Sequence, residues 1–462
     1  KHNALKAWTQ RAGACEIDCG YKDIAADLNL TESMSKLLYS RGQKTSSDAR
    51  KFLRMEETMF HDPYLMKDMD KAVKIIAEAL SQKKKICIYG DYDVDGVTSV
   101  SMLYLYLKSK GGEVCYYIPD RISEGYGMSA SAIEKMSGDG VGLIITVDTG
   151  ITANEEIDHA RSYGIDVIVT DHHECHGELP DALAVVNPKR ADDEYPFKNL
   201  AGVGVVFKLL CAYEFMVSGE ADKLSSVKRI CNEYADLVAL GTIADVMPVL
   251  DENRLIVSFG LKLIENNARL GLAALIEAST QKPEAVGGAK RTPRRARITS
   301  GFIGYTIAPR INAAGRITNA SVAVELFLTD DPDRAYELSE QLCEINRFRQ
   351  SEENKIAEQA YEKIEREHDF ENNPVIVLED NTWHHGVIGI VASRITEKYG
   401  LSSILISFDG QTTAGGAPTD IGKGSGRSIK GLNLVEGLNY CEDVLVKYGG
   451  HELAAGLTVK RG

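Results

Sequence analysis

Short apolar runs and amphipathic segments alternate along the chain between residues 71 and 187. The apolar runs predict buried strands at 85–90, 113–118, 142–148, 166–171 and 184–187. The amphipathic segments predict helices at 71–82, 97–109, 129–136 and 155–163. Strands that alternate with helices indicate a parallel sheet covered by helices on both faces. In such sheets ligands bind beyond the carboxyl ends of the strands, so polar residues at those ends are informative.

The flanking regions have other patterns. Helical spacing predicts helices at 28–39, with Thr31 as N-cap, and at 45–53, while residues 190–330 are mostly helical. Residues 331–367 form one long helical pattern, and residues 373–462 again alternate. We therefore predict an α/β protein in four parts: a helical layer (1–70), a parallel-sheet domain (71–330), a connecting helix (331–370) and a smaller α/β domain (371–462).

Composition narrows the class of protein. Of 462 residues, 44% are hydrophobic and 26% charged, which is typical of soluble globular proteins. The nine cysteines are scattered without the paired spacing of a structural zinc site, which indicates a reducing cytoplasm. No apolar run approaches the ~20 residues that span a bilayer, so we expect no membrane association. The net charge of −14 argues against indiscriminate binding along duplex DNA, although a narrow basic groove remains compatible with it.

Three aspartates, Asp91, Asp93 and Asp95, directly follow the first predicted strand of the parallel sheet. Carboxylates this close repel one another unless a cation lies between them. A helix N-cap is the alternative explanation, but capping needs only one of the three. The pattern therefore favours a divalent-metal site.

The ends of later strands carry the same chemistry. Asp148 ends the strand at 142–148, and Asp171, His172 and His173 follow the next one. Asp245 lies after an apolar helix that is expected to begin near Tyr234. Carboxylate and imidazole ligands without thiolates suit Mn²⁺ or Mg²⁺. The recurrence on consecutive strand–helix units predicts two metal ions.

These residues also carry a resemblance. Asp91-x-Asp93-x-Asp95-Gly, Asp148-Thr-Gly, Asp171-His-His and Asp245-Val are similar to the four motifs of the DHH phosphoesterase superfamily. Within it, the chain resembles the bacterial RecJ single-strand-specific exonucleases from about Leu28 to its end. The segments that carry this second resemblance are Tyr89–Gly96, Ile118–Arg121, Glu124–Gly127, Ala308–Arg316, Trp383–Arg394, Gly424–Ser428 and Gly449–His451.

The resemblance implies roles for the acids and histidines. It implies a parallel-sheet DHH domain joined by a long helix to a DHH-associated substrate-binding domain. The implied ligands of the two metals are Asp93, Asp95, Asp148, His172 and Asp245, with Asp148 as the bridge. Asp91 is a further candidate ligand that could compensate for the departure at Tyr89. His173 is expected to face the scissile phosphate, and Asp171 to orient a ligand. Tyr89 departs from the superfamily's pyrophosphatases, which have histidine there, so we expect one metal to be held more loosely.

Other residues are predicted to bind the substrate. Arg121, Ser425 and Arg427 are candidates for a 5′-phosphate pocket. Tyr126 is predicted to stack on a base, the alternative being a tyrosine packed in a glycine-flanked turn. Arg310 and Asn312 are predicted to contact phosphate, the alternative being a structural arginine at a turn. Residues 422–428 and 449–451 are interpreted as glycine-rich loops that bind phosphate together with His451.

We accordingly expect a metal-dependent 5′-to-3′ exonuclease that hydrolyses single-stranded DNA to 5′-mononucleotides in DNA repair and recombination. The expected partners are a single strand with a 5′ end, a single-strand-binding protein and a helicase. One alternative is a DHH phosphodiesterase acting on short oligoribonucleotides or cyclic dinucleotides, which would share every metal ligand. Another is a non-catalytic DNA-binding relative, which should have lost such ligands.

Overall fold

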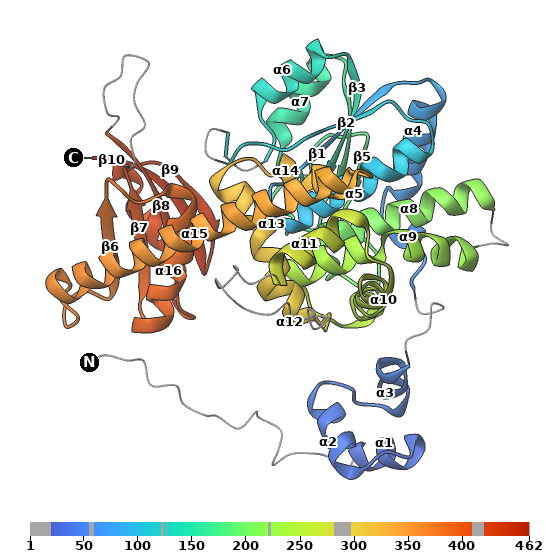
Figure 1. The fold of residues 1–462 in the computed structure, drawn as a ribbon, viewed down its shortest axis with the longest axis horizontal. Helices are drawn as coiled ribbons and strands as arrows, with labels where there is room; N and C mark the ends of the chain where they lie inside the picture. The colour runs from blue at the N-terminus through green and yellow to red at the C-terminus, as the bar shows by residue number, and fades with distance from the viewer. Residues whose placement is uncertain are drawn as a thin grey trace, which may run out of the picture. The chain divides into compact units, whose positions relative to one another are not determined.

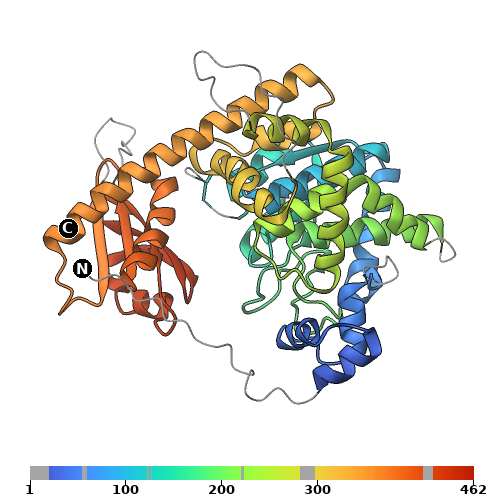
Figure 2. The same ribbon diagram turned by 60° about the horizontal axis from the view of Figure 1, so that its bottom comes forward.

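The computed structural model describes residues 20–54, 60–121, 124–125, 127–219, 223–280, 297–408 and 420–461. They form two compact units, and the chain passes from the first to the second between Cys343 and Glu344. This division falls inside one continuous helix, α15 (Pro332–Glu367), drawn in orange in Figures 1 and 2. The predicted boundaries after residues 330 and 370 flank this helix, whereas the two units share it.

The first unit is built on a parallel sheet of five strands, as predicted (Figure 1). The strands are β1 (Lys85–Gly90), β2 (Val114–Tyr117), β3 (Val141–Val147), β4 (Asp166–Thr170) and β5 (Ala184–Val186). Their order is β2-β1-β3-β4-β5, and every neighbouring pair is parallel. The strand order therefore reverses between β1 and β3, which creates a crevice at their carboxyl ends where such sheets bind ligands.

Helices cover both faces of this sheet because alternate side chains of each strand point in opposite directions. Cys87 and Tyr89 of β1 pack in a cluster with α6 (Ala130–Gly138) and α7 (Asn154–Ser162). Ile86 and Ile88 join the larger core with α4 (Met69–Ser81) and α5 (Val94–Ser109). The expectation of two covered faces is confirmed.

The rest of the first unit is helical. Its central element, α8 (Gly202–Ser218), is buried from Gly202 to Phe215, in agreement with the helical pattern predicted for residues 190–330. The elements that follow are α9 (Lys223–Ala244), α10 (Asp251–Asn267), α11 (Leu270–Thr280), α12 (Ser300–Phe302), the π-helical turn η4 (Ile303–Ile307), α13 (Ala308–Ile317) and α14 (Ser321–Leu328). None of the helices in the described part of the chain has both the length and the apolar character that a membrane crossing requires.

The N-terminal helices are α1 (Gly20–Leu28), α2 (Glu32–Ser40) and α3 (Ser46–Leu53), followed by the short turn η2 (Pro63–Leu65). The hydroxyl of Thr31 accepts a hydrogen bond from the Met34 amide and caps α2, which confirms the predicted cap. The predicted start of this helix at Leu28 is wrong, because Leu28 is the last residue of α1. The short break before the cap was not evident from hydrophobic spacing.

The second unit contains a mixed sheet of order β6-β7-β8-β10-β9. Its elements are β6 (Val375–Asp380), α16 (His385–Tyr399), β7 (Ser402–Ser407), β8 (Ile421–Arg427), α17 (Leu434–Asn439), η5 (Glu442–Val444), β9 (Leu445–His451) and β10 (Ala454–Lys460). The pair β6–β7 is parallel, and the other neighbouring strands are antiparallel.

The prediction that residues 422–428 and 449–451 are glycine-rich loops is wrong, because residues 422–427 lie in β8 and residues 449–451 lie in β9. Gly422, Gly424 and Gly426 alternate along β8 and face apolar side chains. A Cβ added at Gly424 would lie 2.8 Å from Cγ of Leu457, and one at Gly426 would lie 2.6 Å from Cδ2 of Leu434. These glycines allow close packing rather than a turn.

Candidate metal centre

The aspartate-rich segment after β1 is the N-terminus of α5, which begins at Val94. Asp93 is its N-cap, and its Oδ1 accepts a hydrogen bond from the Gly96 amide at 3.0 Å. Gly96 itself packs so closely that an added Cβ would lie 2.4 Å from the Asp91 carbonyl oxygen. The capping explanation therefore holds for Asp93 and leaves Asp91 and Asp95 to be explained.

Asp95 is 1% exposed and accepts two hydrogen bonds from the first turn of α8. The amides of Gly202 and Val203 donate to its Oδ2 and Oδ1 at 2.6 and 2.9 Å. The positive end of a helix thus faces this carboxylate. Burial, followed by repulsion from Asp93, nevertheless raises the pKa of Asp95 to about 7.

Asp148 follows β3 with a backbone φ of 59°, a left-handed conformation that few residues other than glycine adopt. Its side chain is buried, and no described residue forms a hydrogen bond with its Oδ1. Burial and repulsion from Asp95, Asp93 and Asp91 raise the pKa of Asp148 well above its ordinary value. A buried carboxylate among like charges, with an Oδ1 that forms no hydrogen bond with the described residues, is what a cation would stabilise.

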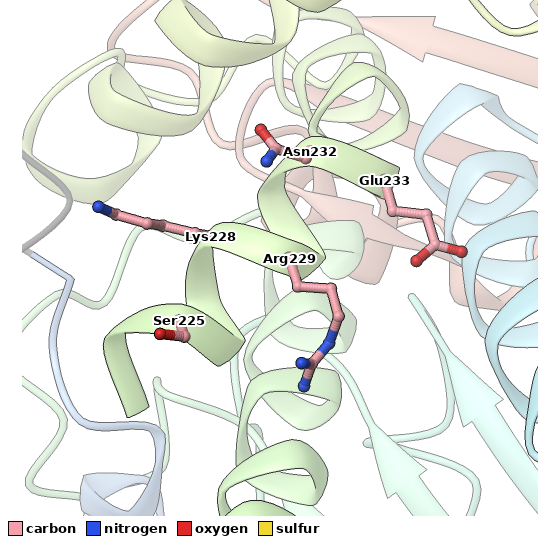
Figure 3. Close-up of a pocket in the computed structure, with 5 residues that line it drawn as sticks. All are labelled: Ser225, Lys228, Arg229, Asn232 and Glu233. Atoms are coloured by element: carbon pink, nitrogen blue, oxygen red, sulfur yellow. The ribbon is translucent and has the colours of Figure 1, made fainter. Parts of the chain in front are cut away.

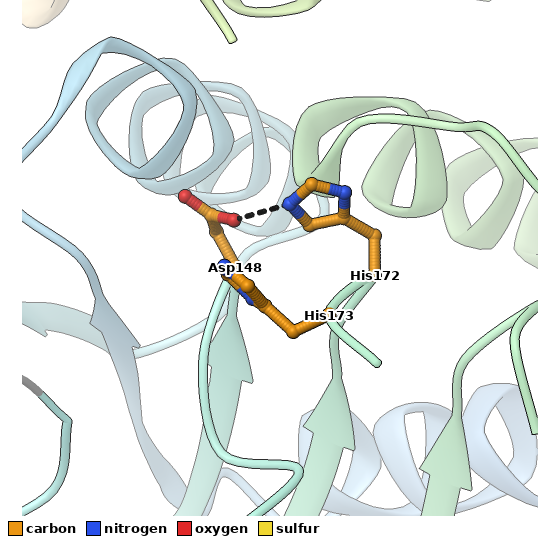
Figure 4. A group of neighbouring side chains, drawn as sticks. All are labelled: Asp148, His172 and His173. Atoms are coloured by element: carbon orange, nitrogen blue, oxygen red, sulfur yellow. Dashed lines mark ion pairs between the residues drawn. The ribbon is translucent and has the colours of Figure 1, made fainter. Parts of the chain in front are cut away.

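His172 faces these acids from the end of β4. Its Nε2 lies 3.1 Å from Oδ1 of Asp148 (Figure 4) and 3.7 Å from carboxylate oxygens of both Asp95 and Asp245. Burial and the neighbouring His173 lower the pKa of His172, which favours the neutral imidazole that metals bind. Asp245, as predicted, directly follows an apolar helix, although α9 begins at Lys223 rather than near Tyr234.

The side chains form three overlapping groups that could each hold an ion: Asp91, Asp93 and Asp148; Asp95, His172 and Asp245; and Asp148, His172 and His173. The six residues predicted as ligands therefore all lie in one cluster. Asp148 and His172 each belong to two groups, which suits a shared or bridging position. Oxygen and imidazole donors, several of whose buried atoms form no hydrogen bond with the described residues, fit two divalent cations.

Asp171 and His173 form a hydrogen-bonded pair beside this cluster. Oδ1 of Asp171 lies 2.7 Å from Nδ1 of His173 and also accepts the backbone amide of His172, while its Oδ2 accepts the amide of Ile151. Burial lowers the pKa of His173, but the hydrogen bond to Asp171 and the nearby carboxylates outweigh it and raise that pKa to about 9. Asp171 thus orients His173, and His173 is cationic near neutral pH.

Tyr89 points away from the predicted ligands. Its hydroxyl donates to the carbonyl oxygen of Gly127 at 2.9 Å, and its ring stacks on Tyr117 at a centroid distance of 5.3 Å. Glu124 accepts hydrogen bonds from the Tyr117 hydroxyl and the Asp120 amide, both at 2.7 Å. These contacts anchor the segment that carries Arg121.

The guanidinium of Arg121 lies 4.9 Å from the ring centroid of Tyr92, within the aspartate-rich segment. Arg121 is one of the charges that lower the pKa of Asp91, although burial and Asp93 raise that pKa overall. The structure therefore brings Arg121 to the metal cluster. Tyr126 lies outside the described residues.

Arg310 and Asn312, on α13, form contacts within the protein. Arg310 donates to the Thr306 carbonyl oxygen and lies 3.4 Å from Sγ of Cys343. Oδ1 of Asn312 accepts the amide of Val94 at 3.1 Å and so supports the start of α5. Both contacts agree with the structural alternative, and substrate binding by these residues stays a prediction.

Ser425, Arg427 and His451 belong to the second unit. Nη1 of Arg427 donates to Oγ of Ser425 at 3.1 Å. A Cβ added at Gly389 of α16 would lie 2.8 Å from the same Oγ, so α16 packs directly on these side chains. His451 is exposed at the end of β9.

Sequence reasoning missed residues that act through close packing. A Cβ at Gly202 would lie 2.9 Å from Oδ1 of Asp148, and one at Gly241 would lie 2.8 Å from Oδ1 of Asp95. It also assigned no role to Arg316, although this charge is among those that act on Tyr92. Arg316 lies in Ala308–Arg316, a segment that carries the resemblance to the RecJ exonucleases, and that resemblance was the available signal for it.

A hollow on α9 contains none of the predicted site residues. It is lined by Ser225, Lys228, Arg229, Asn232 and Glu233 (Figure 3). Arg229 lies 2.5 Å from a carboxylate oxygen of Glu214, so its charge is already paired.

Comparisons with known proteins agree with this geometry. Residues 85–242 match the DHH family, N-terminal domain, and residues 372–462 match the DHHA1 domain. The single-stranded-DNA-specific exonuclease RecJ of Bacillus subtilis is 41% identical over 95% of the chain and 52% of its own length. RecJ of Salmonella typhimurium is 35% identical over 94% of the chain and 72% of its own length.

Among solved structures, RecJ of Thermus thermophilus in complex with Mn²⁺ matches with a TM-score of 0.77 and 32% identity, over 96% of this chain and 58% of that one. The chain thus spans little more than half the length of the Bacillus and Thermus proteins. It covers nearly three quarters of the Salmonella protein at a level of identity that establishes common ancestry. The chain belongs to the RecJ family.

Proposed function

We propose that this chain hydrolyses the phosphodiester bonds of single-stranded DNA from the 5′ end and releases 5′-mononucleotides. The observation that carries the proposal is the cluster of five aspartates and His172 at the reversal of strand order, in a chain of the RecJ family. The relatives are named single-stranded-DNA-specific exonucleases, which supports this substrate.

The proposed cofactors are two divalent cations, Mn²⁺ or Mg²⁺, held by the six predicted ligands. Such a pair supplies activation of water and neutralisation of charge on the phosphate. The Mn²⁺ in the Thermus relative supports this assignment. The chain's own contribution is to hold the carboxylates close together, with α8 directed at Asp95 and Asp148 fixed in a left-handed conformation.

His173 is proposed to hold a non-bridging oxygen of the scissile phosphate through its ring. Its 41% exposed side chain can reach substrate, while its Nδ1 is occupied by Asp171. The raised pKa of about 9 keeps the ring protonated near neutral pH, so it can donate a charge-assisted hydrogen bond. Asp171 is then a positioning residue that fixes the ring and maintains its charge.

The 5′ end of the strand is proposed to be bound by Arg121, Ser425 and Arg427. Arginine grips phosphate through two donors, and Gly389 lets α16 approach Ser425 and Arg427. Base stacking by Tyr126 and phosphate contacts by Arg310, Asn312 and His451 are proposed on the family resemblance. In this scheme residues 71–330 are catalytic, 371–462 bind substrate, 331–370 connect them and 1–70 form an accessory layer.

We further propose a role in DNA repair and recombination in the cytoplasm, with a single-strand-binding protein and a helicase supplying the strand. The proposed substrate supports this role, because single strands with free 5′ ends arise when duplex DNA is unwound.

The proposal is tested with long single strands labelled at either end, in the presence of Mn²⁺. The wild type should release labelled mononucleotide at once from 5′-labelled strands and shorten 3′-labelled strands progressively. Asp148→Ala should be inactive, and Asp158→Ala, which changes an exposed aspartate on α7, should match the wild type. Activity retained in Asp148→Ala would overturn the metal assignment.

Activity on a dinucleotide distinguishes the proposed single-strand exonuclease from the alternative phosphodiesterase. Equal rates on a dinucleotide and a long strand would favour the phosphodiesterase for short oligoribonucleotides. A folded protein that takes up no Mn²⁺ would favour the non-catalytic alternative.

A further inference from the structure

The second unit has a basic row on one face of its sheet. Arg427 of β8 and His451 of β9 both pair directly with Ala454 of β10, the strand between them. Directly paired residues of antiparallel strands project to the same face. Helix α16 packs on β7 and β8 and contacts Arg427 from this face, whereas α17 packs on β9 and β10. His451 remains exposed there.

A second basic row runs parallel to the first. Lys423 of β8 and Lys447 of β9 both pair with Thr458 of β10. Lys423 precedes Arg427 by four residues along β8, so both side chains lie on the same face. Four residues of strand separate the two rows by about 13 Å.

The row between them has almost no side chains. Ser425 pairs with Gly456, and Gly456 pairs with Gly449. Both glycines are exposed, and a Cβ added at either would meet nothing within 4 Å. The two basic rows therefore border a trough floored by Gly456 and Gly449, which extends roughly 10 Å from β8 to the edge strand β9.

The charge of this trough is opposite to that of the whole chain. Its borders carry Lys423, Arg427, Lys447 and His451, and none of the three rows contains a carboxylate, although the net charge is −14. Packing against apolar side chains explains Gly422, Gly424 and Gly426 on the opposite face, but no packing by the described residues explains Gly449 and Gly456. An exposed position without a side chain gives a ligand access to the sheet.

We propose that this trough binds the sugar–phosphate backbone next to the terminal nucleotide, with Lys423 and Lys447 contacting its phosphates. The inference rests on the proposed function and extends its binding site from Ser425 and Arg427 to the edge strand. Lysine contacts with phosphates carry no base preference, as a sequence-independent nuclease requires. The length of the trough suits one to two nucleotides.

The floor is tested with Gly456→Val, with Gly437→Ala as the control. Both glycines have free space at Cβ, and valine favours strands, so both variants should fold with an unchanged or higher Tm. Gly456→Val should raise KM for a 5′-phosphorylated oligothymidylate about tenfold with kcat unchanged within about twofold. Gly437→Ala should match the wild type. An unchanged KM in Gly456→Val overturns the trough.

The borders are tested by salt dependence. Kd for a fluorescent oligothymidylate is measured by anisotropy in EDTA over a range of salt concentrations. The double variant Lys423→Ala/Lys447→Ala should flatten the slope of log Kd against log salt by about 1.4, because each single-strand phosphate contact contributes about 0.7. Lys355→Ala, which removes a half-exposed lysine from α15, should leave the slope unchanged.

The outcomes distinguish the two proposals. A double variant with the wild-type slope overturns the trough alone, provided that the wild type degrades single strands. A wild type inactive on single-stranded DNA overturns the proposed function and, with it, this inference.

Discussion

The carboxyl edge of the first sheet and the open face of the second are built on opposite principles. At the first, buried acids are crowded together, and the Oδ1 atoms of Asp91 and Asp148 have no hydrogen-bond partner among the described residues. At the second, basic side chains border an exposed strip without side chains. In the first region, repulsion between buried carboxylates destabilises the metal-free protein, and bound cations would relieve it. The second region instead offers open space and positive charge to a polyanion. Stability measurements should therefore separate the two regions.

The largest effect is expected at Asp148. Asp148→Asn should reduce exonuclease activity by about a thousandfold or more, because it removes the proposed shared ligand of the two cations. The same variant should raise the Tm of the metal-free protein near neutral pH, because it removes a carboxyl whose pKa is raised by folding and which therefore opposes folding.

Calorimetry in EDTA and an activity assay with Mn²⁺ check the two parts of this prediction. Asp158→Asn, on the exposed side of α7, serves as the control and should change neither. A lower Tm for metal-free Asp148→Asn would contradict the idea of stored repulsion.

The affinity of the first region for Mn²⁺ should depend strongly on pH. Without metal, burial raises the pKa of both Asp95 and Asp245 to about 7. Below pH 7 protons occupy these carboxylates and compete with the cation, so affinity rises as they are lost. Between pH 6 and 8 the Kd for Mn²⁺ should fall about 10- to 100-fold. Titration calorimetry in two buffers of different ionisation enthalpy would reveal the released protons, and a pH-independent Kd would refute the prediction.

A smaller effect is expected at Tyr89, a residue of β1 that supports the segment carrying Arg121. Tyr89→Phe removes the hydrogen bond to Gly127 and should destabilise the protein by about 1–2 kcal/mol. It should raise KM for 5′-phosphorylated strands about fivefold and leave kcat nearly unchanged, since no metal ligand is touched.

Urea unfolding and steady-state kinetics measure these changes. Tyr336→Phe on α15, where the side chain is exposed, is the matched control. A loss confined to kcat would indicate instead that Tyr89 acts on the metal centre.

The smallest effect is expected at Gly389. The methyl group of Gly389→Ala would meet the flexible ends of Ser425 and Arg427 at 2.8 and 3.1 Å, so both side chains should shift at little cost in stability. The preference for a 5′-phosphate over a 5′-hydroxyl should fall about two- to threefold. Gly437→Ala, with open space at its Cβ, should keep the wild-type preference.

Local patterns in the sequence were sufficient for the elements of the parallel sheet and for most of the candidate metal-binding cluster. The strand ends of the parallel sheet were predicted to within one residue, because a buried parallel strand is a continuous apolar run bounded by polar residues. Asp91, Asp148, His172 and Asp245 were found because acids and imidazoles recur at the ends of consecutive elements. The cap at Thr31 is likewise local chemistry.

The tertiary structure decided what depends on distant neighbours. Asp95 accepts hydrogen bonds from amides more than one hundred positions away along the chain. Gly202 and Gly241 leave room for the carboxylates of Asp148 and Asp95, respectively, which a larger side chain would displace. The glycines of β8 and β9 were mistaken for loop residues, because glycine has the same local signal whether it permits a turn, a close contact or an open surface. Only the packing on each face of the sheet distinguishes the glycines that contact Leu434 and Leu457 from the glycines that form the exposed floor of the trough.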